Sequence, residues 1–495
     1  MFVTARRDPN HPPCAQRLAI DAARRISASR GDANPMKALR TLLAAGVAAV
    51  LLSGRIAAGA TDGVPAAPPP EAAPASDSES HGEEFAPEDR AEEPDVPPDP
   101  AKAFDLFWKQ GLNYQIRPLV LAPGRVAQYE RHLALEGRIG TKLAGDVGGF
   151  FTAGTLPDIG TQAKLRRFFL YTTGEFRLVY PFLFKVEVGL IGDNPYVDSF
   201  WLAATDLPWL GTLTVGQFDA PMSFDVLTGS TNRSFMEQAA PVQALAPGQK
   251  VGIQAADVSD GRRLSWQAGL FTDGQPQDVG DATDSPLRLL GRIVWRPLQD
   301  LARGEVLHVG ASGSYVLSSS DDVQYRTRPE SYLAPTLLDT GDIDAKSVFL
   351  VGTELAAVRG STSLQAEYLV SFVTARDVGD PILHGGYLLL SQFLTGETRP
   401  YERAIGTFGR LDPLHEFAPW RGPGWGAWEV AARISGADLD DGDVRGGSLW
   451  LLGGEVNWYW NRYVRLALNY ELGSVSNRPE HGFLQFLQAR VQLVI

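Results

Sequence analysis

Long segments in which apolar and polar residues alternate constrain this chain more than any other sequence feature. In residues 464–472, five apolar side chains alternate with Arg465, Ala467, Asn469 and Glu471. Because successive side chains leave a strand on opposite sides, period two predicts a β-strand with one apolar and one polar face. The same alternation recurs after residue 104 in roughly sixteen to eighteen segments of about 9–13 residues, and no helical periodicity competes with it.

The length of these segments separates a membrane barrel from a soluble sheet. Strands in soluble proteins average ~5–6 residues, whereas transmembrane strands need ~9–11 residues at a steep tilt. The polar faces carry Arg, Glu, Gln and Gly, which suits an enclosed aqueous interior, and aromatic residues such as Trp458, Tyr459 and Trp460 gather at segment ends. Lipid offers no partner to a strand edge, so such a sheet must close. The sequence therefore predicts an all-β fold, a closed antiparallel transmembrane β-barrel of about 16 strands over residues 104–495.

The N-terminal part carries an export pattern and a linker. Residues 36–60 have a basic start, a short apolar centre and a small-residue exit at Ala60, which predicts a signal peptide; the alternative is a buried or anchoring helix. Residues 1–35 look unlike an export signal, so Met36 is expected to be the true start. Residues 61–103 are rich in Pro, Ala and acid and predict a disordered linker. Export of a barrel predicts the bacterial outer membrane.

Composition excludes several other classes. The net charge of −13 argues against nucleic acid as a partner. The one cysteine, Cys14, precedes the export pattern, and no metal-ligand constellation, phosphate-binding glycine loop or dinucleotide fingerprint is present. An outer-membrane lipase would need a serine nucleophile beside a histidine, whereas His308 stands alone on its strand. We therefore expect no catalytic residues, no metal and no cofactor.

Four motifs near the C-terminus carry a family resemblance. They are an FLTGE turn at Phe393 to Glu397, a G-x-F-x-R-x-x-P segment at Gly406 to Pro413, GWGAWE at Gly424 to Glu429, and NWY at Asn457 to Tyr459. In this combination the chain resembles the phosphate-selective porin O and P family of bacterial outer-membrane channels. Weaker agreement covers 216–238 and 354–372, so the resemblance spans about 104–495. One departure is Ile495, where such barrels usually end in Phe.

The resemblance implies a homotrimer whose lumen is anion-selective and lined by an arginine ladder and a lysine cluster. The alternation itself assigns basic residues to the inner wall. These pore-lining candidates are Arg138, Lys142, Lys185, Arg263, Arg288, Arg292, Arg296, Arg433, Arg465 and Arg490. The acidic residues at equivalent positions are Glu136, Glu187, Glu354, Glu367, Glu429, Glu455 and Glu471.

The sharpest feature of this lining is Arg288, Arg292 and Arg296 on one face of one segment. At ~3.3 Å per residue, neighbouring members of this row lie about 13 Å apart, which is a plausible stepwise path for anions. Guanidinium groups also match phosphate oxygens bidentately. The alternative is that the arginines pair with lumen glutamates and only neutralise buried charge.

A second feature is residues 220–247, which have few strand signals and many turn formers. We expect this stretch to fold inward as a constriction loop, with Asp225, Arg233 and Glu237 as its charged members. The alternative is an extracellular loop that lies over the rim of the barrel.

The resulting functional prediction is a passive outer-membrane diffusion channel for anions, phosphate among them, or for small hydrophilic solutes. The expected partners are these solutes, outer-membrane lipid and further copies of the chain in a homotrimer. The alternative function is a structural outer-membrane barrel with an occluded lumen, whose 61–103 linker contacts the cell wall.

Overall fold

The computed structural model describes residues 112–116, 135–177, 180–192, 194–259, 261–272, 286–317, 322–419, 422 and 424–495. All of them belong to one compact unit, Pro100–Ile495. The expected N-terminal extension (1–35), signal peptide (36–60) and linker (61–103) lie outside the described residues. Among the helices of the described part, none is long and apolar enough to cross a membrane.

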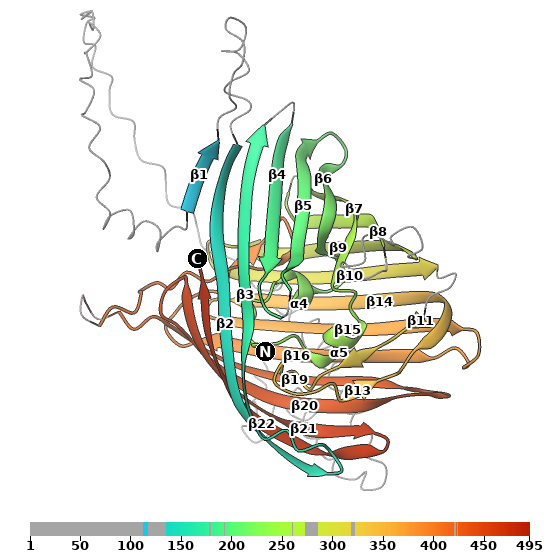
Figure 1. Ribbon diagram of the computed structural model, residues 1–495. Helices are drawn as coiled ribbons and strands as arrows, with labels where there is room; N and C mark the ends of the chain where they lie inside the picture. The colour runs from blue at the N-terminus through green and yellow to red at the C-terminus, as the bar shows by residue number, and fades with distance from the viewer. Residues whose placement is uncertain are drawn as a thin grey trace, which may run out of the picture. The chain divides into compact units, whose positions relative to one another are not determined.

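Sixteen strands form a closed antiparallel barrel (Figure 1), as the alternation predicts. Each strand pairs with its neighbours in the chain, and β2 pairs with both β3 and β22, which closes the ring. The strands are β2 (Leu135–Gly154), β3 (Thr161–Arg177), β4 (Pro181–Gly189), β5 (Tyr196–Leu207), β6 (Gly211–Asp219), β7 (Gln249–Val258), β8 (Leu264–Thr272), β9 (Leu287–Asp300), β10 (Glu305–Leu317), β14 (Ile343–Arg359), β15 (Thr362–Ala375), β16 (Ile382–Phe393), β19 (Ala427–Asp441), β20 (Val444–Tyr459), β21 (Val464–Asn477) and β22 (Glu480–Val494).

Shorter elements accompany the barrel strands. β1 (Leu112–Ile116) pairs with β2, and β11 (Asp322–Val323) pairs with β14. Two small hairpins stand apart from the ring, β12 (Arg326–Thr327) with β13 (Leu338–Asp339) and β17 (Tyr401–Glu402) with β18 (Thr407–Phe408). The short helices α4 (Phe224–Leu227) and α5 (Ala240–Leu245) lie between β6 and β7.

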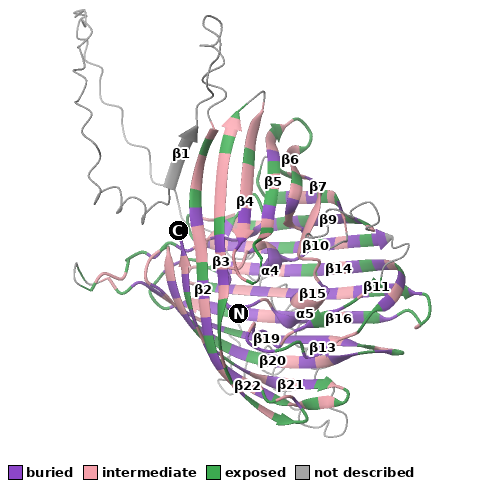
Figure 2. Cartoon of the chain, in the orientation of Figure 1, coloured by how far each residue is buried: buried purple, intermediate pink, exposed green. Residues whose placement is uncertain are grey.

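The outer face of the barrel is apolar along the strands. On β9, Leu289 and Ile293 expose 58% and 50% of their surface, whereas Arg292 between them exposes 3%. Bands of buried and exposed residues alternate in this way along many strands (Figure 2). Trp428 and Trp458, opposite one another on β19 and β20, stack with ring centroids 5.0 Å apart. An exposed apolar face with aromatic residues near its ends is what a barrel presents to lipid.

Three connecting segments pack against the inner wall. The 220–248 segment joins β6 to β7, the 322–342 segment leads into β14, and the 394–419 segment follows β16. Because neighbouring strands are antiparallel, the first two leave from the end where β2 joins β3. The third leaves from the opposite end, where β22 finishes. Apolar residues of the first two segments, such as Phe235 and Leu333, belong to one buried cluster with residues of the wall.

Candidate functional site: the inner wall of the barrel

The inner wall of β2 and β4 carries basic residues that keep access to solvent. Lys142 on β2 and Lys185 on β4 expose 22% and 23% of their side chains. Both bind the carboxylate of Glu187, with Nζ to oxygen distances of 2.6 Å and 2.5 Å respectively. Arg138, further along β2, is half-buried, and its Nε and Nη2 have no hydrogen-bond partner among the described residues. These two lysines share the carboxylate of Glu187, and Asp198 on β5 and Asp219 on β6 lie near enough to interact with both of them.

Strand β3, between them, adds two basic residues that the sequence analysis did not assign to the lumen. Lys164 lies opposite the inward-facing Asp146 of β2 and is exposed. Arg166 exposes 22% of its side chain and donates to Glu237 of the 220–248 segment from Nε (2.7 Å) and Nη2 (3.0 Å). The alternation of Lys164, Leu165 and Arg166 was the available signal. A register irregularity interrupts the pattern at this point, because Leu165 pairs with Gly145 and Arg167 with Ala144, which leaves Arg166 out of the ladder.

An aromatic ring of the 322–342 segment lies among these cations. The ring centroid of Tyr332 is 4.2 Å from Cζ of Arg166, 5.0 Å from Cζ of Arg328 and 5.7 Å from Nζ of Lys164. Cation–π contacts of this kind orient basic side chains without neutralising them. Lys142, Lys164, Arg166 and Lys185 are named below as the basic sector.

The row of arginines on β9 also faces inward, but it is buried. Arg292 donates to Glu354 (2.8 Å) and Gln267 (2.9 Å), and to the carbonyl oxygens of Ile405 (2.7 Å) and Gly406 (2.9 Å).

The other two members of the row have similar surroundings. Arg296 donates to the carbonyl oxygen of Arg262 and to Ser265 Oγ, and Arg288 donates to Ser314 Oγ. The row Arg288, Arg292 and Arg296 is at most 8% exposed. Arg292 pairs with the lumen glutamate Glu354, as the charge-neutralising alternative expects, whereas Arg288 and Arg296 bind hydroxyl and carbonyl oxygens. The stepwise anion path stays a prediction.

Three further predicted residues hold the 220–248 segment against the wall. Arg490 donates to both carboxylate oxygens of Asp146 (2.6 and 2.7 Å) and to the carbonyl oxygen of Met236 (2.6 Å). Arg433 donates to the carbonyl oxygen of Glu237 at 2.9 Å.

Arg465 makes the third attachment, from β21. It donates to the carbonyl oxygens of Arg233 (2.7 Å) and Ser234 (3.0 Å) and pairs with Glu455 at 2.9 Å. None of the three side chains, Arg433, Arg465 and Arg490, exposes more than 5%.

Acidic residues of the wall fasten the backbone of the same segment. Glu367 on β15 accepts hydrogen bonds from the amides of Phe224 (2.9 Å) and Asp225 (2.7 Å), and Glu455 on β20 accepts from the amide of Met236 (2.9 Å). A buried amide without a partner is costly, and a carboxylate acceptor makes a stronger bond than a neutral one. The 220–248 segment is therefore attached on both its backbone and its side chains.

The three charged residues expected in the constriction loop have different partners. Asp225 and Arg233 bind within the segment, with Arg233 Nε 3.3 Å from the Asp225 carboxylate. Glu237 reaches the wall and pairs with Arg166 and Arg490. Burial alone would raise the pKa of Glu237, but these two guanidinium groups outweigh it and hold that pKa well below its ordinary value.

The motif residues of the C-terminal half meet at one carboxylate. Glu429 accepts hydrogen bonds from Arg399 (3.0 Å), Asn457 (3.2 Å), Tyr459 (2.8 Å) and Ser234 (2.6 Å). The GWGAWE and NWY motifs thus supply one acceptor and two of its donors. Through Arg399 the 394–419 segment is bound to Glu429, and through Ser234 the 220–248 segment is bound to the same carboxylate.

Two placements differ from the sequence analysis. Arg263 does not lie in a strand: it belongs to the exposed turn before β8, because the strand begins only at Leu264. His308 is not alone, since its Nδ1 is 2.6 Å from the hydroxyl of Tyr401 and its Nε2 is 3.2 Å from Glu354. In the described part of the chain, no group of three acidic, His or Cys side chains could hold a metal ion.

Comparison with known proteins identifies the family of this barrel. The family model described as "Phosphate-selective porin O and P" matches residues 138–494. The chain belongs to the phosphate-selective porin O and P family. This confirms the resemblance carried by the C-terminal motifs, and it places the protein in the bacterial outer membrane. Family and fold fit a channel rather than an enzyme.

Individual proteins that the chain matches share a third or less of its residues. The chain is 31% identical over 332 residues to an uncharacterized protein of Caulobacter vibrioides, and the match spans 63% of either chain. Among solved structures, the barrel is similar to the anion-selective porin from Comamonas acidovorans, with 10% identity, a TM-score of 0.46, and coverage of 73% of this chain and 100% of that one. It is also similar to the trimer form of OmpT of Vibrio cholerae, with 11% identity, a TM-score of 0.46, and coverage of 73% and 99%.

Proposed function

We propose that the protein is a passive diffusion channel with a preference for small anions, and that the solute path follows the basic sector. One observation carries this proposal: Lys142, Lys164, Arg166 and Lys185 keep contact with solvent, whereas the predicted pore-lining arginines of β9, β19, β21 and β22 are buried. Only charges that a solute can approach through water set the selectivity of a channel.

The mouth of the proposed path lies at the end where β2 joins β3. A pocket of about 320 Å³ at this end is lined by Lys164, Arg328, Asp158 and six other residues. Two of its three charged lining residues are basic, and the basic sector continues from Lys164 down the wall. The 220–248 segment faces this sector through Glu237, so we propose that it narrows the path as a constriction loop.

We propose general anion preference rather than phosphate specificity. A guanidinium binds phosphate best with both arms of its fork free, but the fork of Arg166 is occupied by Glu237. Lys142, Lys164 and Lys185 act instead as point charges, which attract anions with little regard to shape. Small uncharged hydrophilic solutes remain compatible with such a lining.

The second candidate is a structural barrel with an occluded lumen. It is favoured by the buried cluster that joins the wall to Met222 and Phe235 of the 220–248 segment and to Leu333 of the 322–342 segment. Such packing is more extensive than a wide aqueous pore would need. If this candidate is correct, the purified protein inserts into a bilayer without producing conductance steps.

Planar-bilayer recording tests both candidates. We expect discrete conductance steps, with a reversal potential in a KCl gradient that shows chloride crossing faster than potassium. The double substitution Lys164→Gln with Lys185→Gln should lower this preference at least twofold and leave the Lys142–Glu187 pair intact. Arg359→Gln is the matched control, because that side chain is 91% exposed at a turn on the outside of the lumen. Cation preference in the wild type would refute the proposed path.

We also propose that the protein works as a homotrimer, supported by its family membership. The measurement is the mass of the detergent-solubilised protein by light scattering, with the detergent contribution subtracted. A monomeric mass at the lowest detergent concentration that keeps the protein in solution would contradict this proposal.

A further inference from the structure

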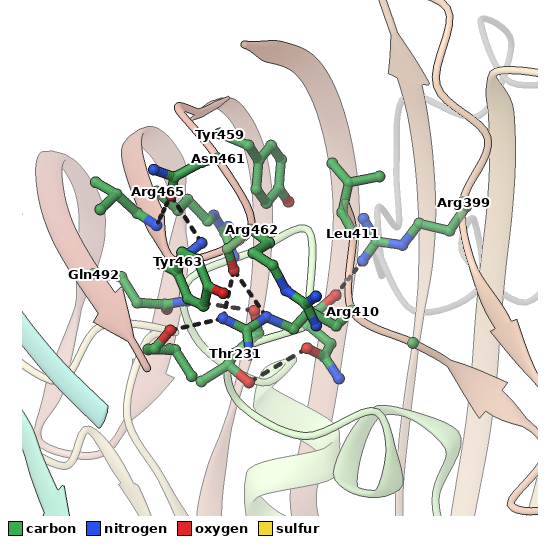
Figure 3. A pocket seen from close by; sticks show the side chains of 14 residues that line it. Thr231, Arg399, Arg410, Leu411, Tyr459, Asn461, Arg462, Tyr463, Arg465 and Gln492 are labelled. Atoms are coloured by element: carbon green, nitrogen blue, oxygen red, sulfur yellow. Dashed lines mark hydrogen bonds between the residues drawn. The ribbon is translucent and has the colours of Figure 1, made fainter. Parts of the chain in front are cut away.

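An arginine-rich cavity lies at the end of the barrel where β22 finishes, away from the basic sector. It is enclosed by the 394–419 segment, the turn between β20 and β21, the end of β22 and the tip of the 220–248 segment (Figure 3). Four of its fourteen lining residues are Arg399, Arg410, Arg462 and Arg465, and none of the fourteen is acidic.

The charges of these arginines are unequally compensated by protein groups. Arg399 pairs with Glu429 at 3.0 Å and Arg465 with Glu455 at 2.9 Å. Within the described part of the chain, the one carboxylate that pairs with Arg462 is that of Asp412, at 4.0 Å.

Arg410 has no carboxylate partner among the described residues. It donates from Nε to the carbonyl oxygen of Arg462 (2.8 Å) and from Nη2 to that of Val494 (2.7 Å). Carbonyl oxygens satisfy donors but do not neutralise a positive charge. The ring of Tyr463 lies 5.4 Å from Cζ of Arg410 and 5.6 Å from Cζ of Arg462, so both guanidinium groups contact the same ring.

A second, independent feature points to a ligand. Arg399 is 4% exposed, and its buried Nε–H has no hydrogen-bond acceptor among the residues that the structure describes. A buried guanidinium donor without an acceptor is costly. The cavity is positively charged, and one donor on its wall is unsatisfied. A negatively charged ligand that accepts hydrogen bonds would satisfy both.

We propose that this cavity is a binding site for one small inorganic anion of about the size of chloride. The cavity encloses about 20 Å³, slightly more than the ~10–15 Å³ that a single water needs, which excludes organic anions. The bound ion would accept from Arg399 and from one of the less compensated cations, Arg410 or Arg462. It would thereby link the 394–419 segment to the turn between β20 and β21. The site is separate from the proposed solute path and requires no conduction.

Bromide provides a direct test, because it replaces chloride and is visible by anomalous scattering. Crystals of the full-length protein in detergent would be transferred to NaBr, and data would be collected above the bromine edge. The expected result is an anomalous peak inside the cavity, within hydrogen-bond distance of Arg399 or Arg410. An empty cavity in crystals that show bromide elsewhere on the protein would overturn the proposal.

Thermal unfolding in detergent supplies a second readout with a matched control. A ligand that binds only the folded state raises Tm, so replacing gluconate by chloride at constant ionic strength should raise the Tm by about 1–3 °C. Arg410→Gln should abolish this rise, whereas Arg359→Gln, at the same end of the barrel, should retain it. If Arg410→Gln does not fold, Arg462→Gln replaces it, since that side chain is 44% exposed. An equal rise with phosphate would refute the assignment to a small ion.

Discussion

The basic sector on β2–β4 and the buried arginines on β9 and β19–β22 begin from the same sequence signal but have different surroundings. In both regions a basic residue occupies an inward position of an amphipathic strand. Lys185 keeps 23% of its side chain exposed, whereas Arg292 keeps 1%. The difference lies in what covers them. The 394–419 segment binds Arg292 through the carbonyl oxygens of Ile405 and Gly406, and no comparable segment among the described residues binds Lys185.

A side chain that points inward is therefore not always exposed to the lumen. The sixteen strands set the direction of each side chain, but the inward segments determine which charges meet water. On β21 and β22, Arg465 and Arg490 hold the 220–248 segment, which in turn excludes water from them. Burial of a pair such as Arg490 and Asp146 carries a desolvation cost that their attraction only partly offsets. Such pairs therefore specify where a segment lies more than they add stability.

The largest expected effect follows from breaking one attachment. Arg490→Ala removes the partner of Asp146 and one of the two partners of Glu237, and leaves buried carboxylates with less compensation. We expect the free energy of unfolding in urea to fall by about 3–5 kcal/mol. The matched change Arg359→Ala, on an exposed side chain, should stay within about 0.5 kcal/mol. A small effect of Arg490→Ala would mean that the 220–248 segment is not held from β22.

The stability contributed by Glu237 should depend on pH. This residue pairs with Arg166 of the basic sector and with Arg490 of the buried group, so it connects the two regions. Its pKa is lower in the folded protein than the ~4.3 of an unfolded glutamate, so it stabilises the fold above pH 4.3. That contribution is lost as the pH falls from about 4.3 through the folded pKa. Unfolding in urea at a series of pH values should show Glu237→Gln less stable than wild type by a constant amount from pH 8 to about 5. The difference should shrink below pH 4; a difference that disappears already at pH 6 would contradict these pairings.

A smaller effect is expected from the aromatic contact in the basic sector. Tyr332→Leu removes the ring beside Arg166, Arg328 and Lys164 but keeps an apolar side chain. Exposed cation–π contacts contribute about 0.5–1 kcal/mol each, so the loss of three should lower the free energy of unfolding by about 1.5–3 kcal/mol. Noise on the open-channel current should increase, because the three cations lose a common orienting surface. Tyr315→Leu on the outer face, where the ring is 43% exposed, is the control. Equal current noise in both variants would remove Tyr332 from the solute path.

The sequence predicts strand direction well because the period of two is a local property. It places Glu455 and Asn457 on the inner face and Leu452 and Val456 on the outer face, as the structure has them. It fails where the backbone departs from regular geometry, as at the turn that holds Arg263 and the irregularity beside Arg167. The alternation also cannot predict which inward residues are covered by another segment, since the contact between Arg292 and Gly406 joins residues 114 positions apart. The motif residues Glu429, Asn457 and Tyr459 identify the family, but the alternation does not show that they share a hydrogen-bond network.

The smallest expected effect is on ion selectivity when a buried pair is removed. The double substitution Arg292→Gln with Glu354→Gln deletes one charge of each sign and keeps side chains that can hydrogen-bond. Because Arg292 and Glu354 are 1% and 4% exposed, neither contributes to the potential that a solute meets. The reversal potential in a KCl gradient should therefore stay at the wild-type value within measurement error, even if the barrel unfolds at lower urea. Lys164→Gln with Lys185→Gln, measured under the same conditions, should shift that potential toward zero. A shift of equal size in both double variants would mean that water reaches β9, and the distinction between the two regions would fail.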